Sequence, residues 1–537
     1  MNAGEAKHKL QVIKTLLGTG MIQPVRPDRA VRSIRALRRW GPTPAAAYTG
    51  SAARYPDRAA IVDEKGTLTF EEVQRRTNSL ARGLQAEGVG EGDGVAIMCR
   101  NHRGFIDATV ACSKLGANAL YLNTAFAGPQ IADVVRREDP KVLIYDEEFA
   151  GLVSEGCVGR KCFVGWRDPG ETPSAPLLEE LIAREDDSEL KPPSEKGRVV
   201  ILTSGTTGTP KGATRKQPES LDPAAALFSK IPLKARETTM IAAPMFHSWG
   251  FAHFTLGLPL ASTLVLRRRF DPEDTLRAVA QHRASALAVV PVMLQRILEL
   301  EKETIARYDT HALKVIAISG SALPGELATR AMDVFGDVVY NLYGSTEVAW
   351  ATIATPEDLR AAPGTAGRPP LGTVVKLLDG DGHEVQAGHG GRIFVANELV
   401  FEGYTGGGGK EVVAGLMSTG DVGHFDADGR LFVDGRDDEM IVSGGENVFP
   451  REIEDLLADH EQIEEAAVIG VEDAQFGQRL KAFVVSRDGT ELSEQAVKAY
   501  VKENLARYKV PREVVFLAEL PRNATGKVLK RELKDQE

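Results

Sequence analysis

A loop rich in glycine and threonine follows an apolar run near the middle of the chain. Residues 201–212 read Ile-Leu-Thr-Ser-Gly-Thr-Thr-Gly-Thr-Pro-Lys-Gly. Glycines let successive backbone N–H groups approach an anion, hydroxyls add further donors, and Lys211 adds a positive charge. Pro210 and Gly212 stand where a Walker A loop has its second glycine and its Ser or Thr, which disfavours a kinase or P-loop NTPase. The pattern predicts a loop that binds phosphate. Its expected contacts are Thr203, Ser204, Gly205, Thr206, Thr207, Gly208 and Lys211.

This loop resembles the signature of the adenylate-forming superfamily, which includes acyl-CoA synthetases, nonribosomal-peptide adenylation domains and beetle luciferases. Further motifs follow in the family's order from about Tyr55 to Lys530, so the resemblance covers nearly the whole chain. Within the superfamily the chain looks most like the fatty acyl-CoA synthetases of the AMP-dependent synthetase and ligase family. The resemblance implies ATP and Mg²⁺, with coenzyme A as co-substrate.

The second motif is Asn-Leu-Tyr-Gly-Ser-Thr-Glu at residues 341–347, after a strand-like run. By the resemblance, Tyr343 would stack on adenine, Thr346 would contact the α-phosphate and Glu347 would bind Mg²⁺. The residue types fit, because an aromatic ring suits a planar base and a carboxylate suits a hard cation; a simple turn is the alternative. Leu342 replaces the glycine common in the family, and we expect this to affect only the local adenine contact. The resemblance adds to the nucleotide site Asn341, Gly344 and Ser345 and, from another strand end, Ser319, Gly320, Ser321 and Ala322.

Two more motifs resemble the ribose contacts and the hinge of the family. Asp421 would accept hydrogen bonds from both ribose hydroxyls, and Arg436 would be the second ribose contact. Asp438 stands at the hinge position. Residues 441–450 then resemble the loop that enters the site for the thioester step. The residues expected along the pantetheine path are Ser443, Gly444, Gly445 and Glu446.

The C-terminal motif at residues 521–527 ends on Lys527. By the resemblance, this lysine would bridge the attacking carboxylate and the α-phosphate and stabilise charge during adenylation. A lysine so near a charged C-terminus is ordinarily solvated. The turn formed by Thr525 and Gly526 favours the catalytic role.

A histidine and a group of apolar residues are the candidates for the acid site. No third ligand follows His247 and His253 at metal-binding spacing, so a metal site is disfavoured here. The resemblance places His247 near the substrate carboxylate as a catalytic residue; a half-buried structural histidine is the alternative. The expected acyl pocket consists of Trp249, Phe251, Val348, Ala349 and Trp350. Since this set contains no cation to pair a second carboxylate, we expect an apolar monocarboxylic acid.

The elements that must position these residues alternate along the chain. Strand-like runs such as 94–98, 199–203 and 315–319 are separated by helical patterns such as 71–87 and 272–281. This alternation predicts an α/β protein with mixed sheets sandwiched by helices, followed by a β subdomain and a small mobile α+β unit. The expected division is a basic amphipathic segment at 1–40, an ATP- and acyl-binding domain at 41–435, a hinge at 436–439 and a catalytic lid at 440–537.

Charge is distributed unevenly. Residues 1–40 carry nine Lys and Arg against two acidic residues, although the 537-residue chain has a net charge of −10. The overall charge gives no pull toward nucleic acid, and no apolar run reaches the ~20 residues of a membrane span. A basic amphipathic segment suits an anionic membrane surface; a helix packed on the body is the alternative.

The four cysteines form no disulfide pattern, so we expect free thiols in a cytoplasmic protein that can lie at the inner face of the membrane.

These features predict a ligase that converts a medium- or long-chain fatty acid to acyl-AMP, releases pyrophosphate and transfers the acyl group to coenzyme A. Alternatives in the same fold are an acyl-AMP ligase that loads a carrier-protein phosphopantetheine, an aryl or other acid–CoA ligase, and a luciferase-like oxygenase. A lipid-binding protein without catalysis would not need Lys527, Glu347 and Asp421 together. A homodimer is compatible with the sequence.

Overall fold

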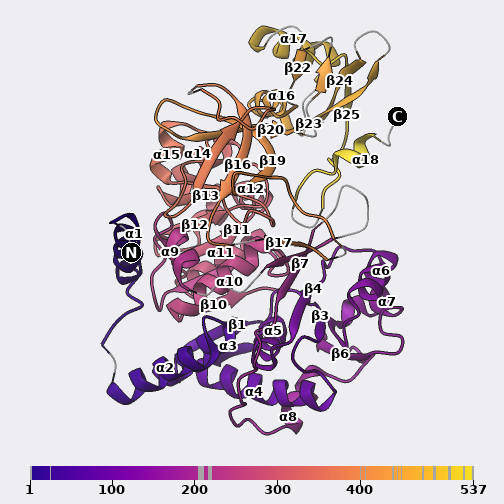
Figure 1. Cartoon of the computed structure of the whole chain (residues 1–537). Coiled ribbons are helices and arrows are strands. Elements are labelled where there is room, and N and C mark those ends of the chain that lie inside the picture. Colours follow the sequence, from indigo (N-terminus) through magenta and orange to yellow (C-terminus); the bar gives the residue numbers. More distant parts are fainter. Residues whose placement is uncertain are drawn as a thin grey trace.

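The computed structural model describes residues 3–24, 26–203, 211–215, 220–386, 388–399, 401–405, 407–437, 441–443, 446–448, 450–473, 477–487, 492–505, 509–523 and 526–534. A large N-terminal part contains two α/β sheets and a β subdomain, and a small C-terminal unit lies above it in the view of Figure 1. The predicted α/β architecture is confirmed. The predicted domain boundaries and the mobility of the small unit stay predictions.

The first α/β sheet has seven strands in the order β17-β8-β7-β4-β3-β5-β6. The strands from β7 to β6 in this order pair in parallel, whereas β8 pairs antiparallel with both of its neighbours, β7 and β17. Parallel strands covered on both faces need continuous apolar runs, which is how these strands read in the sequence. The bounds are β3 Gly94–Met98, β4 Asn118–Tyr121, β5 Val142–Asp146, β6 Lys161–Trp166, β7 Val199–Thr203, β8 Lys211–Arg215 and β17 Phe401–Tyr404.

The second α/β sheet has eight strands in the order β14-β13-β12-β11-β9-β10-β1-β2. Only the two edge strands, β14 and β2, pair antiparallel to their neighbours. The carboxyl ends of β9, β11, β12 and β13 therefore meet at one edge of the sheet. The bounds are β1 Ala59–Asp63, β2 Gly66–Thr69, β9 Thr238–Ile241, β10 Thr263–Leu266, β11 Ala286–Val289, β12 Val315–Ile318, β13 Val339–Tyr343 and β14 Thr352–Ala354.

Helices join the two sheets into one body. A shared hydrophobic core contains Ile61 and Leu264 of the eight-stranded sheet, Ile97 of the seven-stranded sheet, and Phe105 and Phe254 of the helices between them. The helices of the large part are α1 Ala3–Gly18, α2 Pro27–Trp40, α3 Pro44–Arg54, α4 Phe70–Ala86, α5 Arg103–Leu115, α6 Gly128–Glu138, α7 Ala150–Val153, α8 Leu178–Arg184, α9 Asp222–Phe228, α10 Ser248–Leu260, α11 Pro272–Gln281, α12 Pro291–Leu298, α13 Lys302–Ala306, α14 Gly325–Phe335 and α15 Pro356–Ala361, with a 3₁₀ turn at Glu147–Phe149.

The β subdomain and the C-terminal unit each contain a five-stranded sheet. In the subdomain the strands are β15 Val374–Leu378, β16 Gly391–Ala396, β18 Val412–Val413, β19 Leu416–Phe425 and β20 Leu431–Arg436. The C-terminal unit comprises β21 Ile441–Ser443, β22 Glu446–Val448, α16 Pro450–Ala458, β23 Ile463–Asp473, β24 Gly477–Ser486, α17 Glu494–Asn504, β25 Glu513–Phe516 and α18 Lys530–Lys534.

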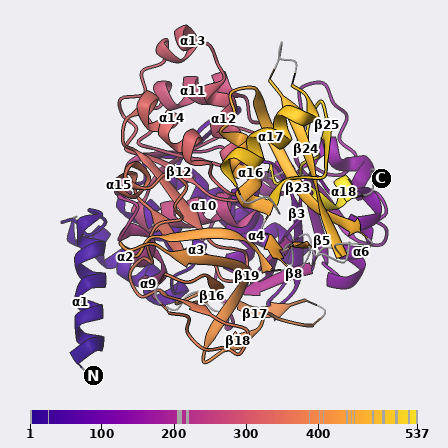
Figure 2. The same ribbon diagram turned by 90° about the horizontal axis from the view of Figure 1, so that it is seen from above.

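The N-terminal segment forms two separate helices. Figures 1 and 2 both show α1 at the edge of the molecule, joined to α2 by a short extended stretch. One face of α1 packs on the body through Val12 and Leu16, and α2 buries Ala36 and Trp40. Among the described residues, no helix has both the length and the apolar character to cross a bilayer.

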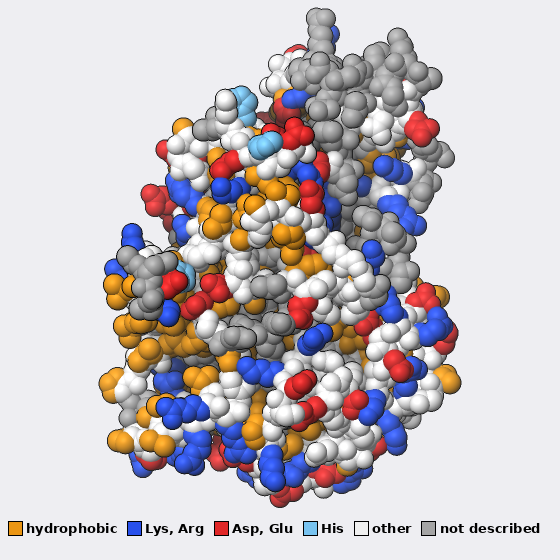
Figure 3. All heavy atoms as spheres, in the orientation of Figure 1, with side chains coloured by type: hydrophobic (Ala, Val, Ile, Leu, Met, Phe, Trp, Pro, Cys, Tyr) orange, Lys and Arg blue, Asp and Glu red, His pale blue; other side chains and the backbone are white. Residues whose placement is uncertain are grey.

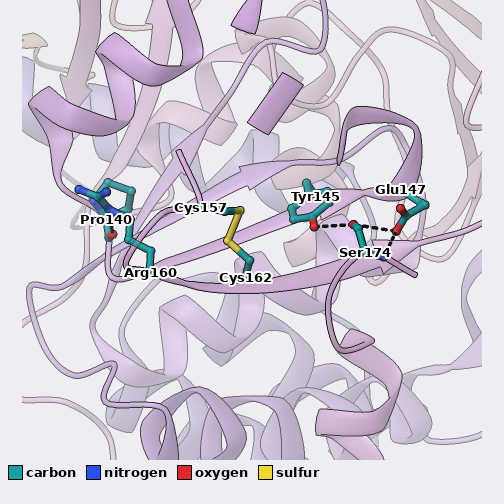
Figure 4. The surroundings of a disulfide bond; sticks show 7 residues. All are labelled: Pro140, Tyr145, Glu147, Cys157, Arg160, Cys162 and Ser174. Atoms are coloured by element: carbon teal, nitrogen blue, oxygen red, sulfur yellow. Dashed lines mark hydrogen bonds between the residues drawn. A yellow bond between two sulfur atoms is a disulfide. The ribbon is translucent and has the colours of Figure 1, made fainter. Parts of the chain in front are cut away.

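The structure corrects the prediction of four free thiols. Cys157 and Cys162 form a disulfide, with their Cα atoms 6.1 Å apart (Figure 4). The turns between α7 and β6 bring the two residues together, through hydrogen bonds from Cys157 N to Val153 O and from Arg160 N to Cys157 O. Cys99 and Cys112 are buried and free, as predicted.

Candidate active site

A cavity of about 1650 Å³ lies where the two α/β sheets and the C-terminal unit meet. Its wall includes Val290, Ser319 and Ser345, which directly follow β11, β12 and β13 or come within two residues of their ends. Lys527 of the C-terminal unit also lines it. Open α/β sheets bind ligands at the carboxyl ends of their strands, so this cavity has the position of a substrate site.

Three residues predicted from separate motifs form one cluster beside the cavity. The hydroxyl of Tyr343 donates a hydrogen bond to Asp421 Oδ2 (2.5 Å). Antiparallel pairing of β19 with β20 places Asp421 opposite Arg436, with Nε 3.7 Å from Oδ1. Burial raises the pKa of Asp421, and the Tyr343 hydrogen bond and the charges of Arg436, Lys527 and Lys410 oppose that rise. The cluster joins a ring, a carboxylate and a cation, as a nucleoside site requires.

Glu347 is held as an ionised carboxylate. Tyr404 donates to its Oε1 (2.6 Å) and Ser345 to its Oε2 (2.9 Å). Burial would raise its pKa, but these hydrogen bonds and the charge of Lys410 hold the pKa of Glu347 below its usual value. An ionised oxygen ligand with lone pairs to spare fits Mg²⁺, so the residues present support the predicted metal site. Lys211, at the start of β8, lies close by, with Nζ 5.5 Å from the ring centre of Tyr404.

The loop after β13 folds back tightly. A Cβ at Gly344 would lie 2.3 Å from the carbonyl oxygen of Ala349, so only glycine fits there. Ala349 itself has a φ of 62°, a backbone conformation that non-glycine residues rarely adopt. This turn directs Thr346 and Ala349 toward the cavity, and both line it.

The N-terminus of α10 contacts the same loop. Ser248 donates to the Thr346 hydroxyl (3.1 Å), and His247 is the N-cap residue of the helix. His247 Nε2 lies 3.4 Å from the side-chain nitrogen of Asn123, and burial lowers the pKa of His247 to about 4. A neutral imidazole therefore lines the cavity, able to donate one hydrogen bond to a carboxylate.

Lys527 is presented by a turn that rests on the large domain. Asn523 and Lys527 exchange hydrogen bonds of 2.9 Å, which close the turn. Gly526 has a φ of 78°, and a Cβ there would lie 2.4 Å from Val292 Cγ1 of α12. Lys527 is exposed and lines the cavity, close enough for its charge to oppose the rise in the pKa of Asp421. The C-terminal unit thus brings its lysine close to the cluster of Tyr343, Asp421 and Arg436.

Four of the five predicted acyl-pocket residues line the cavity: Trp249, Phe251, Ala349 and Trp350. Val348 does not; its side chain is buried in the β-subdomain core because the turn at Gly344 points it away. That Leu342 affects the adenine contact stays a prediction. Leu342 lines the cavity, whereas its neighbour Tyr343 does not and instead donates to Asp421. Strand alternation accounts for this, since neighbouring residues of β13 face opposite sides.

The remaining predicted residues differ in how the structure describes them. Ser319 and Gly320 line the cavity, and Asn341 is buried with its Oδ1 lacking a hydrogen bond. Ser321 and Ala322 follow Gly320 without lining the cavity. Thr203, Ser443 and Glu446 are described as strand backbone only. Outside the described residues lie Ser204, Gly205, Thr206, Thr207, Gly208, Asp438, Gly444 and Gly445.

Comparison with known families decides the assignment. The family described as AMP-binding enzyme matches residues 49–405, and the AMP-binding enzyme C-terminal domain matches residues 452–527. The chain belongs to the AMP-binding enzyme family. This confirms the adenylate-forming superfamily predicted from the motifs, together with ATP, Mg²⁺ and coenzyme A as its co-substrates and cofactor.

Relatives align over most of their length. Indoleacetate–CoA ligase of Aromatoleum aromaticum is 32% identical over 88% of this chain and 94% of its own. 2-Succinylbenzoate–CoA ligase of Geobacillus kaustophilus is 34% identical (89% and 95%), and fatty acid–[acyl-carrier-protein] ligase ScoC of Streptomyces coeruleorubidus is 28% identical (90% and 94%). The ATP-bound structure of MatB from Rhodopseudomonas palustris is 26% identical, with a TM-score of 0.81 over 91% of this chain and 98% of its own.

Proposed function

We propose that this protein is an AMP-forming acid–CoA ligase for an apolar monocarboxylic acid with a long chain. The observation that carries the proposal is the cavity itself. Lys527, Ser345 and Thr346 line one end, with Asp421 near Lys527, and the wall then continues past Trp249 and Phe251 to apolar residues of α2 and α3.

In the first step a carboxylate oxygen of the acid attacks the α-phosphorus of ATP, and the bond to pyrophosphate breaks. Lys527 can contact both the acid and the α-phosphate and stabilise the charge that develops between them. Asp421 and Arg436 hold the ribose, and Thr346 donates to the α-phosphate. Mg²⁺ bound at Glu347 would neutralise phosphate charge.

In the second step the thiol of coenzyme A attacks the acyl carbonyl and AMP leaves. His247, neutral at physiological pH, can donate a hydrogen bond to the acyl oxygen, and the S–H proton is lost to solvent as the C–S bond forms. The loop with Ser443, Gly444, Gly445 and Glu446 is our proposed path for pantetheine, and Asp438 is the proposed hinge that brings it in.

The lining of the cavity supports a long apolar acid. Among the described lining residues, cations cluster at the lid end and recur only at Arg54 of α3. The stretch between them is formed largely by side chains of α10 and α9, among them Trp249, Leu256 and Leu227. An extended hydrocarbon would bury its length there, at about 0.8 kcal/mol per CH₂ group.

An aromatic acid is the second candidate, and the names of the relatives favour it. Indoleacetate and 2-succinylbenzoate are aromatic acids, whereas the name of ScoC specifies a fatty acid and a carrier protein. An aryl acid would occupy only the part of the cavity near Trp249 and Phe251. The fatty-acid and carrier-protein readings therefore need a direct test.

That test is a competition among acids. Purified enzyme, ATP, Mg²⁺ and coenzyme A are incubated with equimolar alkanoic acids from hexanoate to stearate plus benzoate, ferulate and indoleacetate, and thioesters are quantified by mass spectrometry. We expect kcat/KM to rise with chain length and to exceed that of every aryl acid. An aryl-CoA as the dominant product would overturn the long-chain proposal, and acyl-AMP without thioester would point to a carrier-protein acceptor.

Residues 1–40 enter the proposal as a peripheral membrane contact. Their helices expose apolar residues beside Lys and Arg, as a membrane-surface segment requires.

A further inference from the structure

Helix α1 exposes an apolar stripe on the face turned away from the body. Leu10, Ile13 and Leu17 are 67%, 52% and 52% exposed and recur at helical spacing. Val12 is buried and Leu16 packs on the hydrophobic core, so the side of α1 that carries them is the one held against the body. The stripe is therefore not the side by which the helix is held.

Helix α2 and the stretch before it extend this apolar surface. Val31, Ile34 and Leu37 are 50–57% exposed, and Ile22 is 62% exposed. Figure 3 shows hydrophobic side chains gathered on the lower left of the molecule, below α1 and beside α2. So many large apolar side chains exposed together mark an interaction surface.

Positive charges border the apolar surface. Lys7 and Lys14 flank the stripe of α1, and Arg35 and Arg38 stand beside Ile34 and Leu37. Within the described part of the chain these four cations have no acidic partner within ion-pair distance. By contrast, Arg32 and Arg39 are paired with Asp28 and Glu189.

The same surface is continuous with the cavity. Ile34 and Leu37 are half-exposed and also line the cavity, together with Met21, Ala47 and Gly50. Leu258 and Pro259 of α10 continue the wall toward Phe251. Arg54 stands at this end, held by hydrogen bonds to Met21 O and to the Tyr55 hydroxyl. The opening at α2 and α3 is thus apolar with one guanidinium, which suits an amphiphilic carboxylate.

We propose that the α1–α2 surface docks on an anionic membrane and that the acid enters the cavity from the bilayer through the opening between α2 and α3. This inference rests on the proposed function for the identity of the acid. The occupant is a lipid surface because its apolar interior accepts the exposed Leu, Ile and Val, while its anionic headgroups pair with the cationic border. A second copy of the chain would bring two cationic borders together, which opposes association.

A first experiment tests docking by measuring how much of the full chain binds to sedimented vesicles of phosphatidylcholine with and without phosphatidylglycerol. We expect binding only to the anionic vesicles and a loss of at least about tenfold in Leu10→Glu/Ile13→Glu. The matched control is Gly4→Glu/Gln11→Glu, which adds the same charge to exposed positions of α1 away from the stripe. Equal loss in the control, or a solution dimer that only the stripe variant dissociates, would overturn the docking proposal.

A second experiment tests whether the acid enters at this opening, by comparing substitutions at two positions on α2. Ile34 and Val31 are similarly exposed, at 53% and 57%, but only Ile34 lines the cavity. With palmitate presented in anionic vesicles, we expect Ile34→Glu to lower kcat/KM several-fold more than Val31→Glu. Equal effects of the two variants would overturn entry at this opening. If no acid were activated, the proposed function would fail, while the vesicle assay would still decide the docking.

Discussion

Charge and shape at the site are set by a few side chains from distant segments. Tyr404 of β17 donates a hydrogen bond to Glu347. Lys410, which follows β17, contributes a charge that favours the ionised forms of Glu347 and Asp421. No sequence motif singles them out; only the pairing of β17 with β8 brings them to the site. Lys527, Glu347, Asp421 and Arg436 could be named as candidates from the sequence because each lies in a compact motif of its own; their roles stay predictions.

Replacing Lys527 tests whether this residue acts in acyl-AMP formation and not in thioester formation. Its ammonium is the positive group that the C-terminal turn brings to the nucleotide cluster, so Lys527→Ala should slow acyl-AMP formation by about 10²–10³-fold. Thioester formation from supplied acyl-AMP should change little, because that step does not use the lysine. Pyrophosphate release and acyl-CoA formation, measured separately, check both. Exposed Lys502 of α17 provides the control, and equal loss of both half-reactions in Lys527→Ala would refute the assignment.

At the scale of elements, α10 positions one face for substrate and the other for the core. Its first turn presents His247 and Ser248 to the cavity, while Trp249 donates to Val289 O (3.0 Å) and anchors the helix on β11. One turn further along the helix, His253 packs edge-on against Trp249. His253 is 1% exposed, and neither of its ring nitrogens has a hydrogen-bond partner. His253 is therefore a core residue that carries a titratable group.

Burial lowers the pKa of His253 from 6.5 to about 4. Below pH 6.5 the unfolded chain binds a proton at this residue that the folded chain does not, so stability falls as pH decreases from about 6.5 to about 4. His253→Phe should reduce this fall in the free energy of unfolding by up to roughly 3 kcal/mol, since one pKa unit corresponds to ~1.4 kcal/mol. Urea unfolding at several pH values measures it. His247 is unchanged in both proteins, and parallel stability curves for wild type and variant would show that His253 is not the cause.

Element prediction worked where hydrophobic pattern and pairing agree. β3, β7 and α11 have their expected bounds because apolar runs end where burial ends. β23 is longer than its apolar run, reaching from Ile463 to Asp473, since antiparallel pairing with β24 extends over exposed charged residues. The Cys157–Cys162 disulfide was missed because turn geometry, which residue spacing does not reveal, creates it.

At the scale of the whole molecule, the lid contacts the large domain through a very small residue. Gly526 lies against Val292 of α12, and any Cβ there would clash with it. We predict that this contact sets how far Lys527 reaches into the cavity, and that the C-terminal unit is a lid held here in its position for adenylation.

Gly526→Ala should push the turn away from α12 and slow adenylation, both through the clash and through the positive φ of 78°. Adding Val292→Ala removes the clash but not the backbone strain, so it should restore part of the lost rate. Single-turnover formation of acyl-AMP measures both variants. Full activity in Gly526→Ala, or no recovery in the double variant, would show that this contact does not control the lid.

The most direct test of the account is product analysis of the wild-type enzyme with ATP, Mg²⁺ and its preferred acid, first without and then with coenzyme A. The account predicts that acyl-AMP and one pyrophosphate accumulate per site, and that adding coenzyme A converts the bound acyl-AMP to acyl-CoA with release of AMP. Formation of ADP, or an acyl-AMP pool that coenzyme A leaves untouched, would contradict it.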